Sequence, residues 1–316
     1  MKLGISTIYF SRKLTKNLIS WEEIEKKIEH LIDSGLSCIE LNTDIPLSWI
    51  KKIQKWVNTS NIKVSSLHNF CPAVENIPEG KYGFNVYSLT SPDKTEQQLA
   101  LEYTLRTIDF AQLLEAEVVV LHLGEIITNP SGLEVYKIAS QFGVNSEIYK
   151  KYKNELLESR RKNREYYFSI LYSLLDRIVK HAEQKEIKLG IESRFFPNEI
   201  PNFEEINEII SRYKSKFIGY WHDFGHIEIQ SRLGFAEGHM NYFNSYNENI
   251  FGYHIHGVKG LTDHFSPSNS ELKFSNLLNY KNDKLYILEV HGKENFTELI
   301  KGIKLIKTIL GNGRLK

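Results

Sequence analysis

The chain contains only two cysteines among its 316 residues, Cys38 and Cys71, and they lack CxxC spacing. Neither a disulfide framework nor a cysteine metal site is therefore indicated. The 40 basic residues are balanced by 39 acidic ones, so no excess of positive charge favours a nucleic-acid partner, although a local basic patch would not be visible in this balance. There is no apolar run of membrane-spanning length and no signal-peptide pattern, so we expect a cytoplasmic protein without a membrane partner.

Strand-like runs alternate with amphipathic helical patterns along the chain, which is typical of βα units and a parallel sheet. An open doubly wound sheet usually has a glycine-rich turn after its first strand, and the stretch ISTIYFSRK has none. The sequence therefore predicts an α/β fold of the (β/α)8 or TIM-barrel type, as one domain over residues 1–316. The eight strands are expected at residues 2–6, 38–41, 63–67, 117–121, 188–192, 217–221, 250–255 and 285–289.

Two long segments are expected to be insertions at the top of the barrel, residues 69–94 after the third strand and residues 125–153 after the fourth. Long loops in a compact fold are usually functional, so we interpret these segments as walls of a substrate pocket. A basic tract, residues 150–168, leads into a long helix. It is either a solvated helix face or an anion-binding rim.

Most of the predicted strands end on side chains that can bind a metal. The carboxyl ends of the strands in such a barrel surround one mouth, so these side chains are expected to converge. Alone, each has an ordinary explanation as a helix cap, an ion-pair partner or a hydrogen-bonded core residue, but together they indicate a metal site. Four of them lie on successive strands and suit one Mn, Zn, Fe or Co ion: Glu192, Asp223, His254 and Glu289.

This pattern resembles the xylose isomerase-like TIM barrels, a family of sugar epimerases and isomerases that also includes endonucleases of the endonuclease IV type. The resemblance covers essentially the whole chain and includes a D-x-x-H motif at residues 223–226 and the segment HIHGVKGLTDHFSPSNSELKF. It implies that the four residues hold one metal, and that Glu192 and Glu289 move a proton through a metal-stabilised enediolate. We expect an isomerase or epimerase of a sugar, sugar phosphate or keto-acid.

The endonuclease branch implies an alternative, a metallohydrolase of phosphate esters such as abasic DNA, with up to three ions. In that branch an Asp-x-His pair follows the seventh strand, but here Thr262 replaces the Asp and Asp263 is adjacent to the His. The number of ions therefore stays open, from one to three, and a non-catalytic metal-binding barrel is a further possibility. The additional ligands that this branch implies are His68, His122, His226 and His264.

Three neighbouring residues are candidates for contact with a small sugar-like substrate. Arg194 could clamp a carboxylate or phosphate, or could pair with an acid such as Glu199. His256 points the same way as His254 and could bind substrate or orient a ligand, and Lys259 is a weaker candidate. A homo-oligomer is possible. Two other histidines that flank ligands on the opposite pleat are expected to be structural, His222 and His291.

Overall fold

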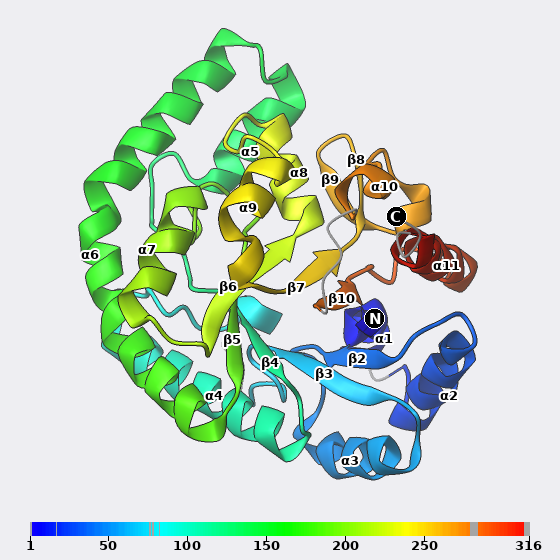
Figure 1. Cartoon of the computed structure of the whole chain (residues 1–316). Coiled ribbons are helices and arrows are strands. Elements are labelled where there is room, and N and C mark those ends of the chain that lie inside the picture. Colours follow the sequence, from blue (N-terminus) through cyan, green and yellow to red (C-terminus); the bar gives the residue numbers. More distant parts are fainter. Residues whose placement is uncertain are drawn as a thin grey trace.

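A computed structural model describes residues 2–312 except 17, 76, 78, 82 and 279–283. Eight parallel strands close into a barrel in the order β1-β10-β7-β6-β5-β4-β3-β2, which confirms the predicted (β/α)8 fold (Figure 1). All eight predicted strands are present; four have the predicted bounds and the ends of the other four differ by one or two residues. They are β1 (Lys2–Ser6), β2 (Cys38–Leu41), β3 (Lys63–His68), β4 (Val118–Leu121), β5 (Lys188–Glu192), β6 (Ile218–Asp223), β7 (Ile250–Ile255) and β10 (Leu285–Leu288).

Helices surround the barrel and bury their apolar faces against it. In α2, Ser20 caps the first turn in a capping box with Glu23, and the apolar residues spaced at three and four positions are buried, as the pattern predicts. None of the helices in the described ranges is long and apolar enough to cross a membrane. The helices are α1 (Ser11–Leu14), α2 (Trp21–Ile32), α3 (Ile50–Thr59), α4 (Lys94–Leu113), α5 (Gly132–Phe142), α6 (Glu147–Lys185), α7 (Phe203–Tyr213), α8 (Phe224–Arg232), α9 (His239–Tyr246), α10 (Phe274–Leu277) and α11 (Phe296–Asn312).

Trp221 fills the centre of the barrel beneath the mouth. It is fully buried, and its ring lies 5.2 Å from that of His254. On the neighbouring strand β7, Gly252 faces the indole of Trp221. A Cβ at this position would lie 2.4 Å from Trp221 Cζ3, so a larger residue would not fit. Core packing against this ring therefore supports His254 from below.

The insertion after β4 forms α5 and the first turns of the 39-residue helix α6. Figure 1 shows α6 running along the outside of the molecule, with α5 near its amino-terminal part. A second apolar cluster joins this insertion to α8, through residues such as Val135, Tyr149 and Ile229. In the insertion after β3, residues 76, 78 and 82 lie outside the described part of the chain.

The basic tract at residues 150–168 forms part of α6, and its inner arginines are paired. Arg160 donates to both oxygens of Glu205 at 2.8 and 2.7 Å, and both side chains are buried. Arg164 donates to the same carboxylate at 3.2 Å. These contacts favour a helix face over an anion-binding rim, because the Glu205 carboxylate already compensates the positive charge of the arginines that face inward.

Candidate active site

The carboxyl ends of the strands surround a cavity of about 480 Å³. Its volume lies within the range of small-molecule sites, roughly 300–1,000 Å³. Its walls include Tyr87, Phe195 and Phe196, aromatic residues that sequence analysis did not single out. The predicted site residues that line it are His68, His122, Glu192, Arg194, His226, His264 and Glu289.

The four residues predicted to share one metal are brought together. One ligand atom from each of Glu192, Asp223, His254 and Glu289 lies within 4.8 Å of all the others, and all four side chains are buried. His254 Nδ1 is 2.5 Å from Glu192 Oε1, 3.2 Å from Glu289 Oε2 and 3.7 Å from Asp223 Oδ2. Three carboxylates thus converge on this nitrogen, which is the His254 atom that would face a metal.

Glu40 on β2 is a fifth member of this centre that sequence analysis missed. It is fully buried, and His254 Nε2–H donates to both of its oxygens at 3.1 Å. The Ser66 hydroxyl also donates to it at 2.9 Å. A carboxylate that accepts from the second nitrogen of a metal-binding imidazole is a common way to fix the tautomer and orientation of that ligand. An acid inside the apolar run CIEL was the only available sequence signal.

The electrostatics of the centre favour a bound cation. Burial raises the pKa of Glu289 well above its ordinary value, and the negative charges of Glu192, Asp223 and Glu40 raise it further, against the opposing effect of His254. Burial alone would lower the pKa of His254, but the surrounding carboxylates outweigh it and raise that pKa well above its usual value. Four buried acids around one imidazole carry more negative charge than that ring can balance. The donor set of one imidazole and three carboxylates therefore fits a divalent metal ion.

A second group consists of His68, His122 and Glu192, whose ligand atoms also lie within 4.8 Å of one another. Glu192 Oε2 is 2.5 Å from His122 Nε2 and 3.7 Å from His68 Nε2. Arg194 reaches into this group and donates from Nη1 to Glu192 Oε2 at 2.8 Å. Its Nε and Nη2 donate to Glu199 Oε1 at 3.0 and 2.8 Å. Arg194 therefore lines the cavity and also forms the ion pair with Glu199 that the sequence left open.

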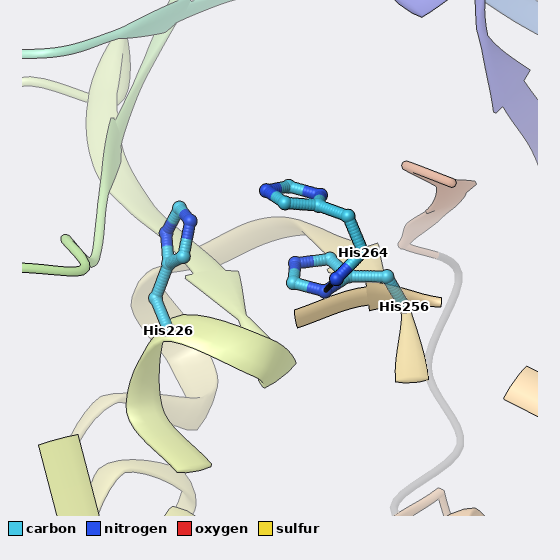
Figure 2. A group of neighbouring side chains, drawn as sticks. All are labelled: His226, His256 and His264. Atoms are coloured by element: carbon cyan, nitrogen blue, oxygen red, sulfur yellow. Dashed lines mark hydrogen bonds between the residues drawn. The ribbon is translucent and has the colours of Figure 1, made fainter. Parts of the chain in front are cut away.

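The third group contains His226, His256 and His264. Figure 2 shows His226 at the start of α8 facing the rings of His256 and His264, whose centroids are 4.0 Å apart. His256 Nδ1 accepts the backbone N–H of His264 at 3.0 Å, and its Nε2–H donates to both oxygens of Asp223 at 3.0 Å. Both nitrogens of His256 are thus engaged, and this geometry matches an orienting role toward Asp223 rather than a metal ligand.

The other two histidines of this group keep one nitrogen each directed at Asp263. The Nδ1–H of His226 donates to the Ser193 carbonyl at 2.9 Å, and that of His264 donates to the Glu289 carbonyl at 2.9 Å. Asp263 Oδ2 lies 3.9 Å from His226 Nε2 and 3.7 Å from His264 Nε2. Asp263 rather than Thr262 therefore lies beside these two imidazoles.

A family model described as a xylose isomerase-like TIM barrel matches residues 28–309. The chain belongs to this family. The resemblance recognised in the sequence is thereby confirmed, although no curated protein sequence matches the chain significantly.

Several solved structures share the fold over nearly the whole chain. A D-tagatose 3-epimerase-like protein is 20% identical, with a TM-score of 0.64 and coverage of 99% of this chain and 98% of the other. The 3-keto-D-glucoside 4-epimerase of E. coli is 11% identical, with a TM-score of 0.65 and coverage of 98% and 99%. The IolI protein with a zinc atom is 15% identical, with a TM-score of 0.63 and coverage of 99% of each chain.

Two predictions about this xylose isomerase-like site differ from what the structure shows. Lys259 is exposed on the strand β8 (Gly257–Lys259), donates to Asn269 Oδ1 and does not line the cavity. His291 was expected to be structural, but it lines the cavity, and its ring stacks on that of His264 at 3.8 Å. His222 is buried and hydrogen-bonded to Tyr220 and to His239, which agrees with a structural role.

Proposed function

We propose that the protein is a metal-dependent isomerase or epimerase of a small sugar, sugar phosphate or keto-acid. The observation that carries this proposal is the position of Glu192 and Glu289. Both belong to the buried group that fits a divalent ion, and both line the cavity. A small polyol in the cavity would therefore lie against two carboxylates and beside the metal-binding group.

These two carboxylates are the groups that would move the proton. A divalent ion bound by Glu192, Asp223, His254 and Glu289 would supply a Lewis acid that makes the hydrogen next to a substrate carbonyl more acidic. Glu192 is held by Arg194 and His254, and the backbone N–H of Glu289 donates to the Ile255 carbonyl at 3.1 Å. Positioned acid–base catalysis of this kind contributes roughly 10²–10⁴-fold. In this proposal one carboxylate removes the proton and the other returns it.

Two further observations support this function. Solved structures that share the fold of this chain include a D-tagatose 3-epimerase-like protein and the 3-keto-D-glucoside 4-epimerase of E. coli. The lining of the cavity also combines polar residues with the rings of Phe195, Phe196 and Tyr87, an arrangement that suits a small polar molecule.

Hydrolysis of phosphate esters by a site with two or three ions is the second candidate. It is favoured by the Asp263, His226 and His264 arrangement, which offers one carboxylate and two imidazole nitrogens beside the cavity. Two ions close together would hold the attacking and leaving oxygens of a phosphate ester.

The test is solvent deuterium exchange, followed by NMR on a panel of ketoses and keto-acids with added Mn, Co or Zn. Wild-type protein should incorporate deuterium at the carbon next to the carbonyl of its substrate. Glu289→Gln should abolish the exchange while leaving the circular dichroism spectrum unchanged, because an amide cannot accept the proton. Lys259→Ala is the matched control, since this residue lies outside the cavity. Wild-type exchange in Glu289→Gln would eliminate the proposed roles, and phosphate ester hydrolysis without exchange would favour the second candidate.

A further inference from the structure

We infer that the guanidinium of Arg194 takes the place of a metal ion in the group formed by His68, His122 and Glu192. The inference rests on the proposed metal dependence of the site. It deepens that proposal, because it specifies which of the neighbouring groups holds an ion and which holds a side-chain cation.

The guanidinium already contacts the atoms that a metal would need. Arg194 Nη1 donates to Glu192 Oε2 at 2.8 Å and is also hydrogen-bonded to His122 Nε2. His122 Nε2 and Glu192 Oε2 lie 2.5 Å apart, and His68 Nε2 is 3.7 Å from the same carboxylate oxygen. A zinc ion bound to this group would lie about 2.0–2.2 Å from each of its ligand atoms. It cannot take this position while Arg194 Nη1 occupies it.

The side chain of Arg194 is anchored on its far side as well. It is 5% exposed, and its Nε and Nη2 both donate to Glu199 Oε1. The other oxygen of Glu199 accepts the backbone N–H of Phe196 at 2.8 Å, and Gln230 donates to the Arg194 carbonyl at 2.6 Å. Swinging the guanidinium out of the group would leave the Glu199 carboxylate without its charged partner, although its side chain is only 14% exposed. The arrangement therefore holds the arginine in place against a competing ion.

Glu192 would then lie between two different cations, Arg194 and the proposed metal ion. Its Oε1 lies with the group of His254, which fits the metal, and its Oε2 accepts from Arg194. An arginine stays protonated under all ordinary conditions, so this position carries one fixed positive charge that does not depend on metal supply. The fixed charge faces the cavity beside the proposed metal, where it complements a negatively charged substrate oxygen. On this inference the His68, His122 and Glu192 group holds a fixed positive charge and does not form half of a dinuclear hydrolytic centre.

The experiment compares metal content between variants after equilibration with excess Co²⁺ and removal of free ion. Elemental mass spectrometry measures the ions per chain, and the Co²⁺ absorption spectrum reports a new coordination sphere. Arg194→Met should bind about one more equivalent than wild type, since the guanidinium no longer occupies the position beside His122 and Glu192. Arg194→Lys keeps the positive charge and should not gain an ion. The double variant Arg194→Met with His122→Ala should return to the wild-type content, which locates the added ion.

The reverse control is His122→Ala alone, which should leave the metal content of the protein unchanged, because His122 binds Arg194 and not an ion. A loss of metal in His122→Ala would overturn the inference, and so would an Arg194→Met variant that gains no ion. Arg194→Gln provides a second variant if Arg194→Met does not fold. Wild-type protein that binds no metal would refute the proposed function and the inference together, whereas a metal-binding wild type with no gain in either Arg194 variant refutes the inference alone.

Discussion

Glu40→Gln should weaken metal binding without touching any predicted ligand. The substitution keeps the shape of the side chain but removes the charge that accepts from His254 Nε2–H at 3.1 Å. Glu40 and His254 are both fully buried, so water cannot compensate for the lost negative charge. His254 would then bind a metal ion more weakly, because its ring would be less basic and its tautomer would no longer be fixed by a carboxylate.

The size of the effect follows from this geometry. Loss of a hydrogen-bonded partner of a metal-binding imidazole typically costs 10–100-fold in metal affinity. At about 1.4 kcal/mol for each factor of ten, this corresponds to roughly 1.4–2.8 kcal/mol of binding free energy. The measurement is the dissociation constant for Zn²⁺ or Mn²⁺, obtained by competition with a chromophoric chelator.

Ser66→Ala is the matched control for Glu40→Gln. It removes the Ser66 hydroxyl that donates to Glu40 at 2.9 Å but keeps the carboxylate beside His254, so its effect on affinity should be smaller. Thermal melts in the presence of chelator check that both variants fold. A dissociation constant for Glu40→Gln within about twofold of wild type would show that Glu40 does not support the metal-binding imidazole.

Two other predictions concern stability. Arg160→Met should lower the free energy of unfolding by about 3–5 kcal/mol in a urea titration, because it leaves Glu205 buried without its main partner. A loss below about 1 kcal/mol would mean that Arg164 alone compensates the Glu205 carboxylate. Removing the metal with a chelator should lower the melting temperature, and restoring free ion to about 100 times its dissociation constant should return roughly 2.7 kcal/mol; an unchanged melt would argue against a metal at the buried four-residue group.

The strands and the convergence of the four candidate metal ligands could be predicted because their signals are local. Apolar runs of four to six residues mark the barrel strands, and the repeating order of strand and helix restricts the topology. In a closed parallel barrel every carboxyl end faces the same mouth, so strand-end residues such as Glu192 and His254 converge without further information. Hydrophobic pattern and strand polarity were sufficient for this part of the site.

The partners of those ligands could not be predicted in the same way. Glu40 and His254 are 214 positions apart, and nothing local to the run CIEL shows that these two side chains meet. Arg194 left two interpretations open, because its direction depends on where Glu199 lies after the turn that follows β5. His291 follows the last barrel strand, and only the folded chain shows that its ring faces the cavity.

The sequence by itself therefore determined the barrel, the family and the residues able to bind a metal, since these depend on periodicity and on residue type at strand ends. Only the tertiary structure decided how the charges are paired. Which oxygen of Glu192 faces His254 and which faces Arg194 depends on side-chain directions within a buried space. Such directions are determined by packing between segments far apart in the chain, and no local pattern in the sequence encodes them.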